Sequence, residues 1–278
     1  MTQLNRTARR WAATGLLGLL AAILFTHAAR PAAATKPAHA KPTVVLVHGA
    51  WADSSSWSGV VRNLQRDGYA VTAPPNPLSG LASDAAYLAG YLDTISGPIV
   101  LVGHSYGGAV ITNAATGDPD VKALVYVNAF VPDQGETVVQ LATAQPGSAI
   151  GGDPATVFDT VPIPGAPGDV DLYVKQSVFP AAFANDLPIK TAAVLAAVQR
   201  PVAFSALVAP SGVPAWRTIP SWYSVGTADN VIPPAQQRIM AARAHAHTVE
   251  VRASHLPMVS RPGHVTRLIL SAAKHRPR

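Results

Sequence analysis

The sequence predicts an α/β fold, with a mostly parallel sheet, helices on both of its faces and a cap inserted over it. Uninterrupted apolar runs, such as 43–47 and 98–102, are typical of strands buried on both faces of a parallel sheet. Stretches with apolar residues at helical spacing alternate with these runs. A G-x-S-x-G pattern at 103–107 directly follows the run at 98–102, which is typical of a sharp turn from a strand into a helix.

The first half of the chain alternates regularly between strand and helix patterns. Apolar residues recur at helical spacing over 57–64 and 87–95, and Gly68 and Gly97 follow these stretches as stop signals. A third helix-compatible stretch, 109–115, follows the G-x-S-x-G pattern. The expected strands lie at 43–47, 69–73, 98–102 and 121–130.

The alternation stops between 131 and about 220. Residues 146–168 hold five prolines and several glycines, so we expect a cap that is flexible in its first part and helical around 191–199. A linker to a second domain is the alternative, which is disfavoured because strand patterns return afterwards. The later strands and helices are expected at 221–225, 233–244, 248–251 and 262–273.

The composition fits one large globular domain. Of the 278 residues, 49% are hydrophobic and 13% are charged, which suits a single domain with a large core. The chain has no cysteine, which excludes disulfides, thiolate metal sites and a cysteine nucleophile. The net charge of +6 comes mainly from residues 1–40, which carry five basic residues and no acidic one. Because no basic stripe remains, nucleic acid is not an expected partner.

Residues 1–40 have the pattern of an export signal, which leaves a domain at 41–278. A basic start is followed by an apolar stretch at 11–25 and by small residues at 32–34 and 38–40. An uncleaved anchor is the alternative, but the apolar stretch is shorter than the roughly 20 residues that span a bilayer. We therefore expect a secreted protein with no stable membrane insertion after cleavage. The pair Arg9-Arg10 leaves twin-arginine export open.

Ser105 is the candidate nucleophile. In a strand-to-helix turn of this kind, one residue adopts strained backbone angles and its side chain is held out into a cleft. Gly103 and Gly107 are needed because a Cβ at either position would collide with a neighbouring strand or helix. The helix N-terminus favours negative charge that develops beside the serine. The alternative is a glycine-rich turn with a surface serine.

The candidate base and acid follow later strands. A serine hydroxyl is a poor nucleophile until a base takes its proton, and a carboxylate must hold that base. Asp229 follows the expected strand 221–225, and His255 follows the last expected strand. Since the ends of parallel strands meet at one edge of the sheet, we predict that both side chains converge on Ser105.

Asp133 and His264 are the alternative acid and base. Asp133 follows the strand at 121–130, while His264 falls inside the start of the last expected helix. We expect His104 to pack away from the nucleophile. A metal site at His245 and His247 is the remaining alternative, but no acidic residue lies close to them in sequence, so no metal is expected.

The loop after the first strand is the candidate oxyanion cradle. The backbone N–H groups of Ala50 and Tyr106 are predicted to bind a developing oxyanion, and Gly49 lets the backbone approach. We expect His48 to steady this loop. Trp51 and Met258 are the predicted substrate-pocket residues, with core packing as the alternative for both of them. Trp216 and Trp222 are likewise expected either to line the substrate pocket or to pack in the core.

With these motifs, the chain resembles the α/β-hydrolases, and most of all the capped branch that holds plant methylesterases, hydroxynitrile lyases and their bacterial relatives. The resemblance spans about 43–270 and rests on the motifs at 45–51, 103–108, 226–229 and 254–258. It implies that the triad partners follow in the order Ser105, Asp229, His255 and that no cofactor is needed. The family's usual first two antiparallel strands have no room between the expected export signal, 1–40, and residue 43, so we expect six strands.

The expected function is that of a secreted serine hydrolase that cleaves small-molecule carboxylic esters through an acyl-enzyme. The resemblance implies that hydroxynitrile lyases carry a lysine after the histidine and a threonine at the glycine; Leu256 and Gly49 occupy these places here. Dehalogenase and epoxide-hydrolase relatives use an aspartate nucleophile. Because Ser105 stands at the nucleophile position here, neither of these two activities is expected. A perhydrolase and a ligand-binding protein with slow turnover stay open as alternatives.

Overall fold

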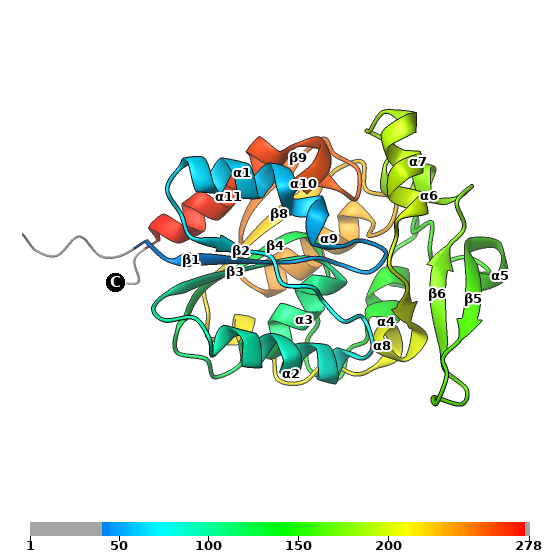
Figure 1. Ribbon diagram of the computed structural model, residues 1–278, viewed down its shortest axis with the longest axis horizontal. Helices are drawn as coiled ribbons and strands as arrows, with labels where there is room; N and C mark the ends of the chain where they lie inside the picture. The colour runs from blue at the N-terminus through cyan, green and yellow to red at the C-terminus, as the bar shows by residue number, and fades with distance from the viewer. Residues whose placement is uncertain (1–40, 276–278) are drawn as a thin grey trace, which may run out of the picture. The chain divides into compact units, whose positions relative to one another are not determined.

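Six parallel strands form the central sheet in the computed structural model, which describes residues 41–275 (Figure 1). All neighbouring strands of this sheet run parallel, in the order β2-β1-β3-β4-β8-β9. The predicted fold class and the predicted number of strands are therefore confirmed. The strands are β1 (Thr43–Val47), β2 (Val71–Thr72), β3 (Ile99–Ser105), β4 (Val121–Ala129), β8 (Ser221–Gly226) and β9 (His247–Val251).

The expected strand at 69–73 is only two residues long. Its two residues pair with Val44 and Val45 of β1 at the edge of the sheet. Pro74 and Pro75 follow, and proline has no N–H for a further ladder bond. The strand ends at Thr72, and one residue separates it from the prolines.

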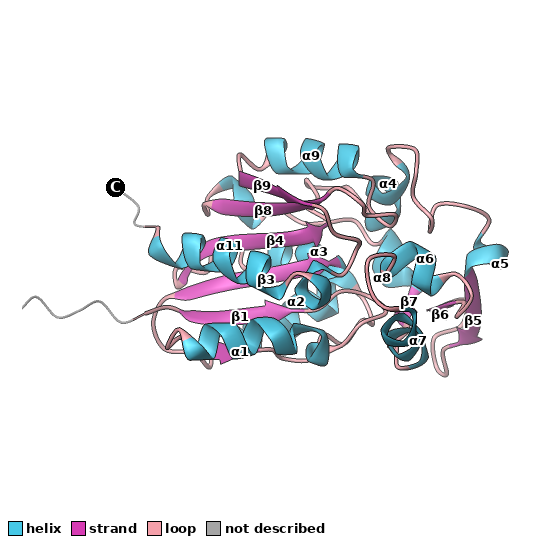
Figure 2. Ribbon diagram, turned by 90° about the horizontal axis from the view of Figure 1, so that it is seen from above, coloured by secondary structure: helices cyan, strands magenta, loops and turns pink. Residues whose placement is uncertain are grey.

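Helices cover both faces of the sheet (Figures 1 and 2). α1 (Ser58–Arg66) and α11 (Pro262–Lys274) pack together on one face, and α2 (Leu81–Leu92) and α3 (Tyr106–Ala114) pack together on the other. The helix expected at 233–244 is α9 (Pro234–Arg243), and the short α10 (Pro257–Ser260) precedes α11. No helix within residues 41–275 is both long enough and apolar enough to cross a bilayer. The expected export signal, 1–40, lies outside the described residues.

The segment between β4 and β8 contains a second, antiparallel sheet at one end of the central sheet (Figure 1). Its first part therefore holds regular elements that the sequence did not predict, while its expected flexibility stays a prediction. The predicted helix near 191–199 is present as α7. The elements of this segment are α4 (Val138–Thr143), α5 (Pro154–Val157), β5 (Phe158–Pro162), β6 (Val170–Val174), α6 (Phe179–Phe183), α7 (Ile189–Ala197), β7 (Val202–Ala203) and α8 (Phe204–Val208).

The hairpin of β5 and β6 forms despite its prolines because they fall outside the strand interiors. Pro162 is the last residue of β5, and the turn that follows holds Gly165 and Gly168 with φ of 82° and 88°. Phe158, at the start of β5, stacks on Trp51 of the loop after β1, with ring centroids 5.5 Å apart. This contact joins residues more than 100 positions apart, so no local pattern reveals it.

Candidate active site

Ser105 ends β3 and stands at the turn into α3. Its backbone angles are φ 51° and ψ −125°, a region that residues other than glycine rarely occupy and that stores strain of order 1–3 kcal/mol. Two glycines make the turn tight. A Cβ on Gly103 would lie 2.6 Å from the carbonyl oxygen of Gly107, and a Cβ on Gly107 would lie 2.6 Å from that of Val47. The strained turn thus depends on glycine at both positions.

Ser105, His255 and Asp229 form a continuous chain of hydrogen bonds. The hydroxyl of Ser105 lies 2.9 Å from Nε2 of His255, and Nδ1 of His255 lies 2.9 Å from Oδ2 of Asp229. All three side chains are buried. Because the carboxylate accepts the Nδ1 proton, Nε2 is left to accept the serine proton. The structure therefore brings together the three residues that the sequence predicts from three separate strand ends.

The carboxylate of Asp229 accepts five hydrogen bonds. Oδ1 accepts the backbone N–H groups of Val231 at 2.8 Å and Ile232 at 3.0 Å. Oδ2 accepts from His255, from Nδ2 of Asn128 at 2.9 Å and from Nε2 of Gln237 at 2.8 Å. The carboxylate is therefore held in one orientation toward the imidazole.

Asn128 and Gln237 were not predicted from the sequence. Asn128 lies in β4 with φ 43°, a left-handed conformation that asparagine adopts more readily than most residues. Its amide also donates to the carbonyl oxygen of Ser254 at 3.0 Å. The space for it exists because Gly226 lacks a side chain: a Cβ there would lie 2.0 Å from Nδ2 of Asn128. The only sequence signal is a polar residue near a strand end.

The loop that carries His255 is fixed on both sides. Nε2 of His104 donates to the carbonyl oxygen of His255 at 2.8 Å, and burial lowers the pKa of His104 well below its ordinary value of 6.5. On the other side, the hydroxyl of Ser254 donates to the carbonyl oxygen of Phe183 at 2.6 Å. The ring of Phe183 also meets the imidazole of His255 edge to face at 5.2 Å. His104 thus supports the backbone of His255 and is turned away from Ser105.

The candidate oxyanion donors lie next to Ser105. A Cβ on Gly49 would lie 2.6 Å from Cβ of Ser105, so the backbone passes directly beside the serine. Among the residues described, the N–H of Ala50 meets no hydrogen-bond acceptor. The N–H of Tyr106 begins α3, where the first N–H groups of a helix have no intrahelical partner. Both groups stay the predicted oxyanion donors.

His48 holds this loop in place. Its Nδ1 donates to the carbonyl oxygen of Gly49 at 2.9 Å, and its Nε2 accepts the backbone N–H of Asn76 at 2.9 Å. Burial lowers the pKa of His48 to about 4, so the ring stays neutral and keeps Nε2 as an acceptor at neutral pH. The arrangement agrees with the expected steadying role of His48.

Asp84 is a further residue that the sequence did not reveal. It is fully buried on α2 and accepts the phenol of Tyr106 at 2.7 Å. It also accepts the N–H and the hydroxyl of Ser79, each at 3.1 Å. Burial, together with the charge of Asp84, raises the pKa of Tyr106. These bonds fix the residue that supplies one of the two candidate oxyanion donors.

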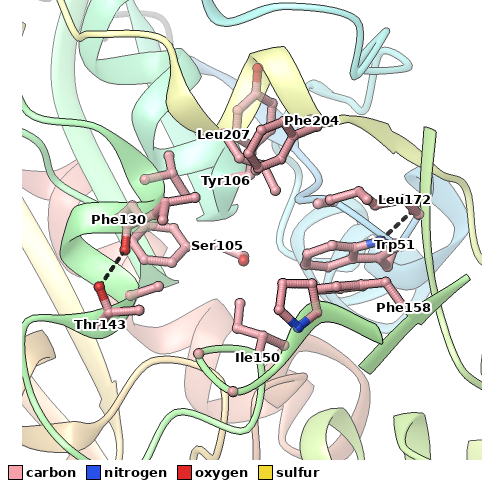
Figure 3. Close-up of a pocket in the computed structure, with 17 residues that line it drawn as sticks. Trp51, Ser105, Tyr106, Phe130, Thr143, Ile150, Phe158, Leu172, Phe204 and Leu207 are labelled. Carbon is pink, nitrogen blue, oxygen red and sulfur yellow. Dashed lines mark hydrogen bonds between the residues drawn. The ribbon is translucent and has the colours of Figure 1, made fainter. Parts of the chain in front are cut away.

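A cavity of about 180 Å³ lies over Ser105 (Figure 3). Its walls come from the loop after β1, from α3 and from the segment between β4 and β8. Most of the residues around it are apolar or aromatic, including Phe130, Phe158 and Leu207. None of its lining residues carries a charge.

Trp51 lines this cavity, as predicted, whereas Met258 does not. Trp51 donates its indole N–H to the carbonyl oxygen of Leu172 at 2.8 Å. Met258 is fully buried on α10 and does not line the cavity, so that prediction is wrong: its side chain packs in the core. Trp216 and Trp222 also lie outside the cavity lining, which leaves core or surface packing as their role.

The alternative acid and base have other partners. Asp133 forms an ion pair with Arg217 near the surface, and His264 on α11 lies 3.2 Å from the hydroxyl of Ser224. His245 and His247 are exposed. Within residues 41–275, no three His, Cys, Asp or Glu side chains are grouped closely enough to bind a metal ion.

Comparisons with known proteins agree with this architecture. The model of the alpha/beta hydrolase family matches residues 44–267. A carbendazim hydrolyzing esterase from Nocardioides sp. (strain SG-4G) is 34% identical over 110 residues, which make up 35% of this chain and 46% of that relative. This match therefore covers about half of the esterase's length.

Two further proteins match over most of their lengths. The alpha/beta hydrolase nvfD from Aspergillus novofumigatus (strain IBT 16806) is 27% identical over 257 residues, which cover 84% of this chain and 97% of nvfD. The crystal structure of a pyrethroid hydrolase from Sphingobium faniae JZ-2 superposes with a TM-score of 0.67 at 24% identity, over 84% of this chain and 97% of that chain. From the family match over 44–267, we conclude that this chain belongs to the alpha/beta hydrolase family.

Proposed function

We propose that this protein is a secreted serine hydrolase that cleaves carboxylic esters through an acyl-enzyme. The observation that carries the proposal is the chain of hydrogen bonds from Ser105, which lines an uncharged cavity, through His255 to Asp229. Membership of the alpha/beta hydrolase family and the similarity to an esterase support it.

In the first half of the reaction, Nε2 of His255 takes the hydroxyl proton as Oγ of Ser105 attacks the ester carbonyl carbon. The C–O bond to the serine forms, and the carbonyl oxygen becomes an oxyanion that the N–H groups of Ala50 and Tyr106 bind. The carboxylate of Asp229 stabilises the imidazolium. Nε2 then returns its proton to the leaving alkoxide, so the alcohol departs and the acyl group stays on Ser105.

In the second half, a water molecule replaces the alcohol. His255 takes a proton from the water, which attacks the acyl carbonyl, and the oxyanion forms again at the same two donors. Collapse of this intermediate breaks the bond to Ser105, which recovers its proton from His255. The products are a carboxylic acid and the free enzyme. Every step uses groups of the chain and water.

The lyase alternative receives no support from the residues beside the triad. A threonine at position 49 would place its Cβ 2.6 Å from Cβ of Ser105 in this backbone. Leu256 is buried and apolar, so it provides no cation after His255 for a departing cyanide. Both observations favour hydrolysis.

Export is part of the proposal and rests on the sequence pattern of residues 1–40. In a bacterial host, the full chain is expected to bring esterase activity to the periplasm or the medium. A version that begins at Lys41 should stay in the cytoplasm. Activity of the full chain in the membrane fraction would support the anchor reading and contradict secretion.

The test of the activity is the hydrolysis of p-nitrophenyl esters from acetate to palmitate. We expect turnover with an optimum of chain length, and a loss of at least about 10⁴-fold in Ser105→Ala with the fold retained. Asp229→Asn should cost less, because the imidazole keeps part of its role, and Asp133→Asn should cost nothing. A folded wild-type protein that is inactive on the whole series would contradict the proposal. Damage from Asp133→Asn instead of Asp229→Asn would contradict the assigned acid.

A further inference from the structure

We propose that the cavity over Ser105 binds the acyl half of the ester, and that this half is one unsubstituted hydrocarbon ring on a short linker. The inference rests on the proposed ester hydrolysis and goes further by naming the substrate class. It follows from the lack of free side-chain donors in the cavity, from its volume and from its position relative to His255.

The cavity offers no unoccupied side-chain donor to a polar substituent. Apart from Ser105, three residues around it carry polar side-chain atoms: Trp51, Tyr106 and Thr143. The indole of Trp51 donates to Leu172, and the phenol of Tyr106 donates to Asp84. The hydroxyl of Thr143 donates to the carbonyl oxygen of Val139 within α4 at 2.9 Å (Figure 3). A hydroxyl or carboxylate on the bound group would therefore find no free side-chain N–H or O–H donor, apart from Ser105, to replace its water partners.

The volume matches a single ring. An apolar cavity of roughly 150 Å³ in another protein is known to bind benzene. The cavity here, about 180 Å³, is slightly larger and has an aromatic wall, where Trp51 stacks on Phe158. Such a wall suits a flat ring, since offset stacking adds to the gain from burial.

The position of His255 assigns the ring to the acyl side. The leaving oxygen must lie near Nε2 of His255 to receive its proton. His255 is fully buried and does not line the cavity, whereas Ala50 and Tyr106, the oxyanion donors, both line it. The open space therefore extends from Ser105 past the oxyanion donors and away from the leaving group, which is the direction of the acyl substituent.

The exposed part of the lining is uncharged and mostly apolar. Val139 on α4 and Phe204 on α8 line the cavity and are also 36% and 44% exposed. The other exposed lining residues are Thr143, Gly151, Gly152 and Pro154. An uncharged hydrocarbon group thus meets mostly apolar surface along the cavity, which is consistent with the proposed substrate class.

The decisive test compares two isomers, ethyl phenylacetate and 2-phenylethyl acetate, by proton release at constant pH. They have the same atoms and differ in which half of the ester carries the ring. We expect kcat/KM to be at least about 10-fold higher for ethyl phenylacetate. Ethyl 4-hydroxyphenylacetate should be about 10- to 100-fold poorer than ethyl phenylacetate, because no free side-chain donor in the cavity replaces the water around its hydroxyl.

A pair of matched variants tests whether the lack of a donor in the cavity causes the lower rate with the hydroxylated ester. Ile150 lies on the loop after α4 and lines the cavity, so Ile150→Gln supplies an amide donor and should narrow the gap between the hydroxylated and plain esters at least about 5-fold. Ile189→Gln makes the same change at an exposed site on α7, outside the cavity lining, and should leave the gap unchanged.

The outcomes separate the two proposals. Equal rates for the isomers, a preference for 2-phenylethyl acetate, or equal rates for the hydroxylated and plain esters would overturn the acyl-ring inference while ester hydrolysis stands. If the wild-type protein hydrolyses no ester faster than Ser105→Ala does, p-nitrophenyl acetate included, the proposed function fails and the inference fails with it.

Discussion

At the scale of single residues, Asn128 links the acid to the histidine loop. One amide group donates to Oδ2 of Asp229 at 2.9 Å and to the carbonyl oxygen of Ser254 at 3.0 Å. Since Ser254 directly precedes His255, one side chain holds both Asp229 and the loop that carries His255. Asn128 is therefore a positioning residue, which acts through the groups that it holds.

Replacement of Asn128 by two different residues separates geometry from charge. Asn128→Asp keeps the shape of the side chain but replaces the donating amide by a carboxylate oxygen, which faces two other acceptors, Asp229 and the carbonyl of Ser254. We therefore expect kcat to fall about 100-fold and the pH profile of the activity to shift. Asn128→Gly tolerates the φ of 43° and loses only the amide, so a fall of about 10-fold is expected. Steady-state kinetics from about pH 5 to 9 measure both effects. If Asn128→Gly were as active as wild type, the positioning role would be wrong.

Gly49 has a similar importance for the oxyanion loop. In Gly49→Ala, the new Cβ would lie 2.6 Å from Cβ of Ser105 and 2.9 Å from the carbonyl oxygen of His104. The loop must shift, and loss of one oxyanion donor costs about 10²- to 10³-fold in kcat. We expect a loss in this range, measured with the best p-nitrophenyl ester.

Gly90→Ala is the matched control for this substitution. Gly90 lies in α2, and no atom lies within 4 Å of the position that a Cβ would take there, so alanine fits without contact. Activity should be unchanged, and the free energy of unfolding should rise by about 0.5–1 kcal/mol because alanine favours the helix. Equal losses in both variants would show that the effect of Gly49→Ala is not specific to the loop.

At the scale of elements, the loop after β1 and the β5–β6 hairpin are joined through Trp51. Its indole donates to the carbonyl oxygen of Leu172 in β6, and its ring packs between Phe158 and Phe183. The same loop carries Ala50. The shape of the cavity wall and the position of an oxyanion donor are therefore coupled through one side chain.

Trp51→Phe should weaken this coupling. The carbonyl of Leu172 loses its donor, so the free energy of unfolding should fall by about 1–2 kcal/mol and KM should rise. Trp216→Phe removes a comparable bond, from the indole of Trp216 to the carbonyl oxygen of Pro132 at 2.9 Å, away from the cavity. That control should lose similar stability at unchanged KM. Urea unfolding and kinetics on both variants check this, and equal KM values would argue against the coupling.

At the scale of the whole molecule, two buried histidines make stability depend on pH. Burial lowers the pKa of His48 from 6.5 to about 4 and that of His104 well below 6.5. Above about pH 7, both are neutral in the folded and unfolded chains. Below pH 6.5, the unfolded chain binds protons that the folded chain does not, so the free energy of unfolding falls with falling pH, down to about pH 4 for His48.

Between about pH 7 and pH 5, the free energy of unfolding should therefore fall by about 2 kcal/mol through His48, and His104 should add to the fall in the same direction. Urea unfolding at the two pH values measures the change. His104→Gln should make this fall smaller, whereas His245→Gln, at an exposed position, should leave it unaltered. Equal stability of the wild-type protein at both pH values would contradict the prediction.

The predictable part of the molecule depends on local patterns. Apolar runs such as 43–47 are typical of strands buried on both faces, which predicted a parallel sheet. The short distance between the expected export signal and residue 43 predicted six strands. Ser105, Asp229 and His255 were identifiable because each follows a strand, and parallel strands end at one edge of a sheet. The structure brings them within 2.9 Å of one another along the chain of hydrogen bonds.

Other features were decided by contacts between distant parts of the chain. Met258 stands next to the histidine motif but packs into the core, because the direction of its side chain depends on where α10 lies. The hairpin at 158–174 needs Trp51 as its packing partner. Asn128 reaches Asp229 only because β4 and β8 are neighbours and Gly226 leaves room for it.

The sequence by itself thus determined the order of strands and helices through the first half of the chain, the strained turn at Ser105 and the three residues that meet there. Only the tertiary structure decided which polar groups hold them and what shape the cavity has. The physical reason is that backbone conformation and burial pattern follow from neighbours in sequence, whereas hydrogen-bond partners and cavity walls come from side chains that only the packed fold brings together.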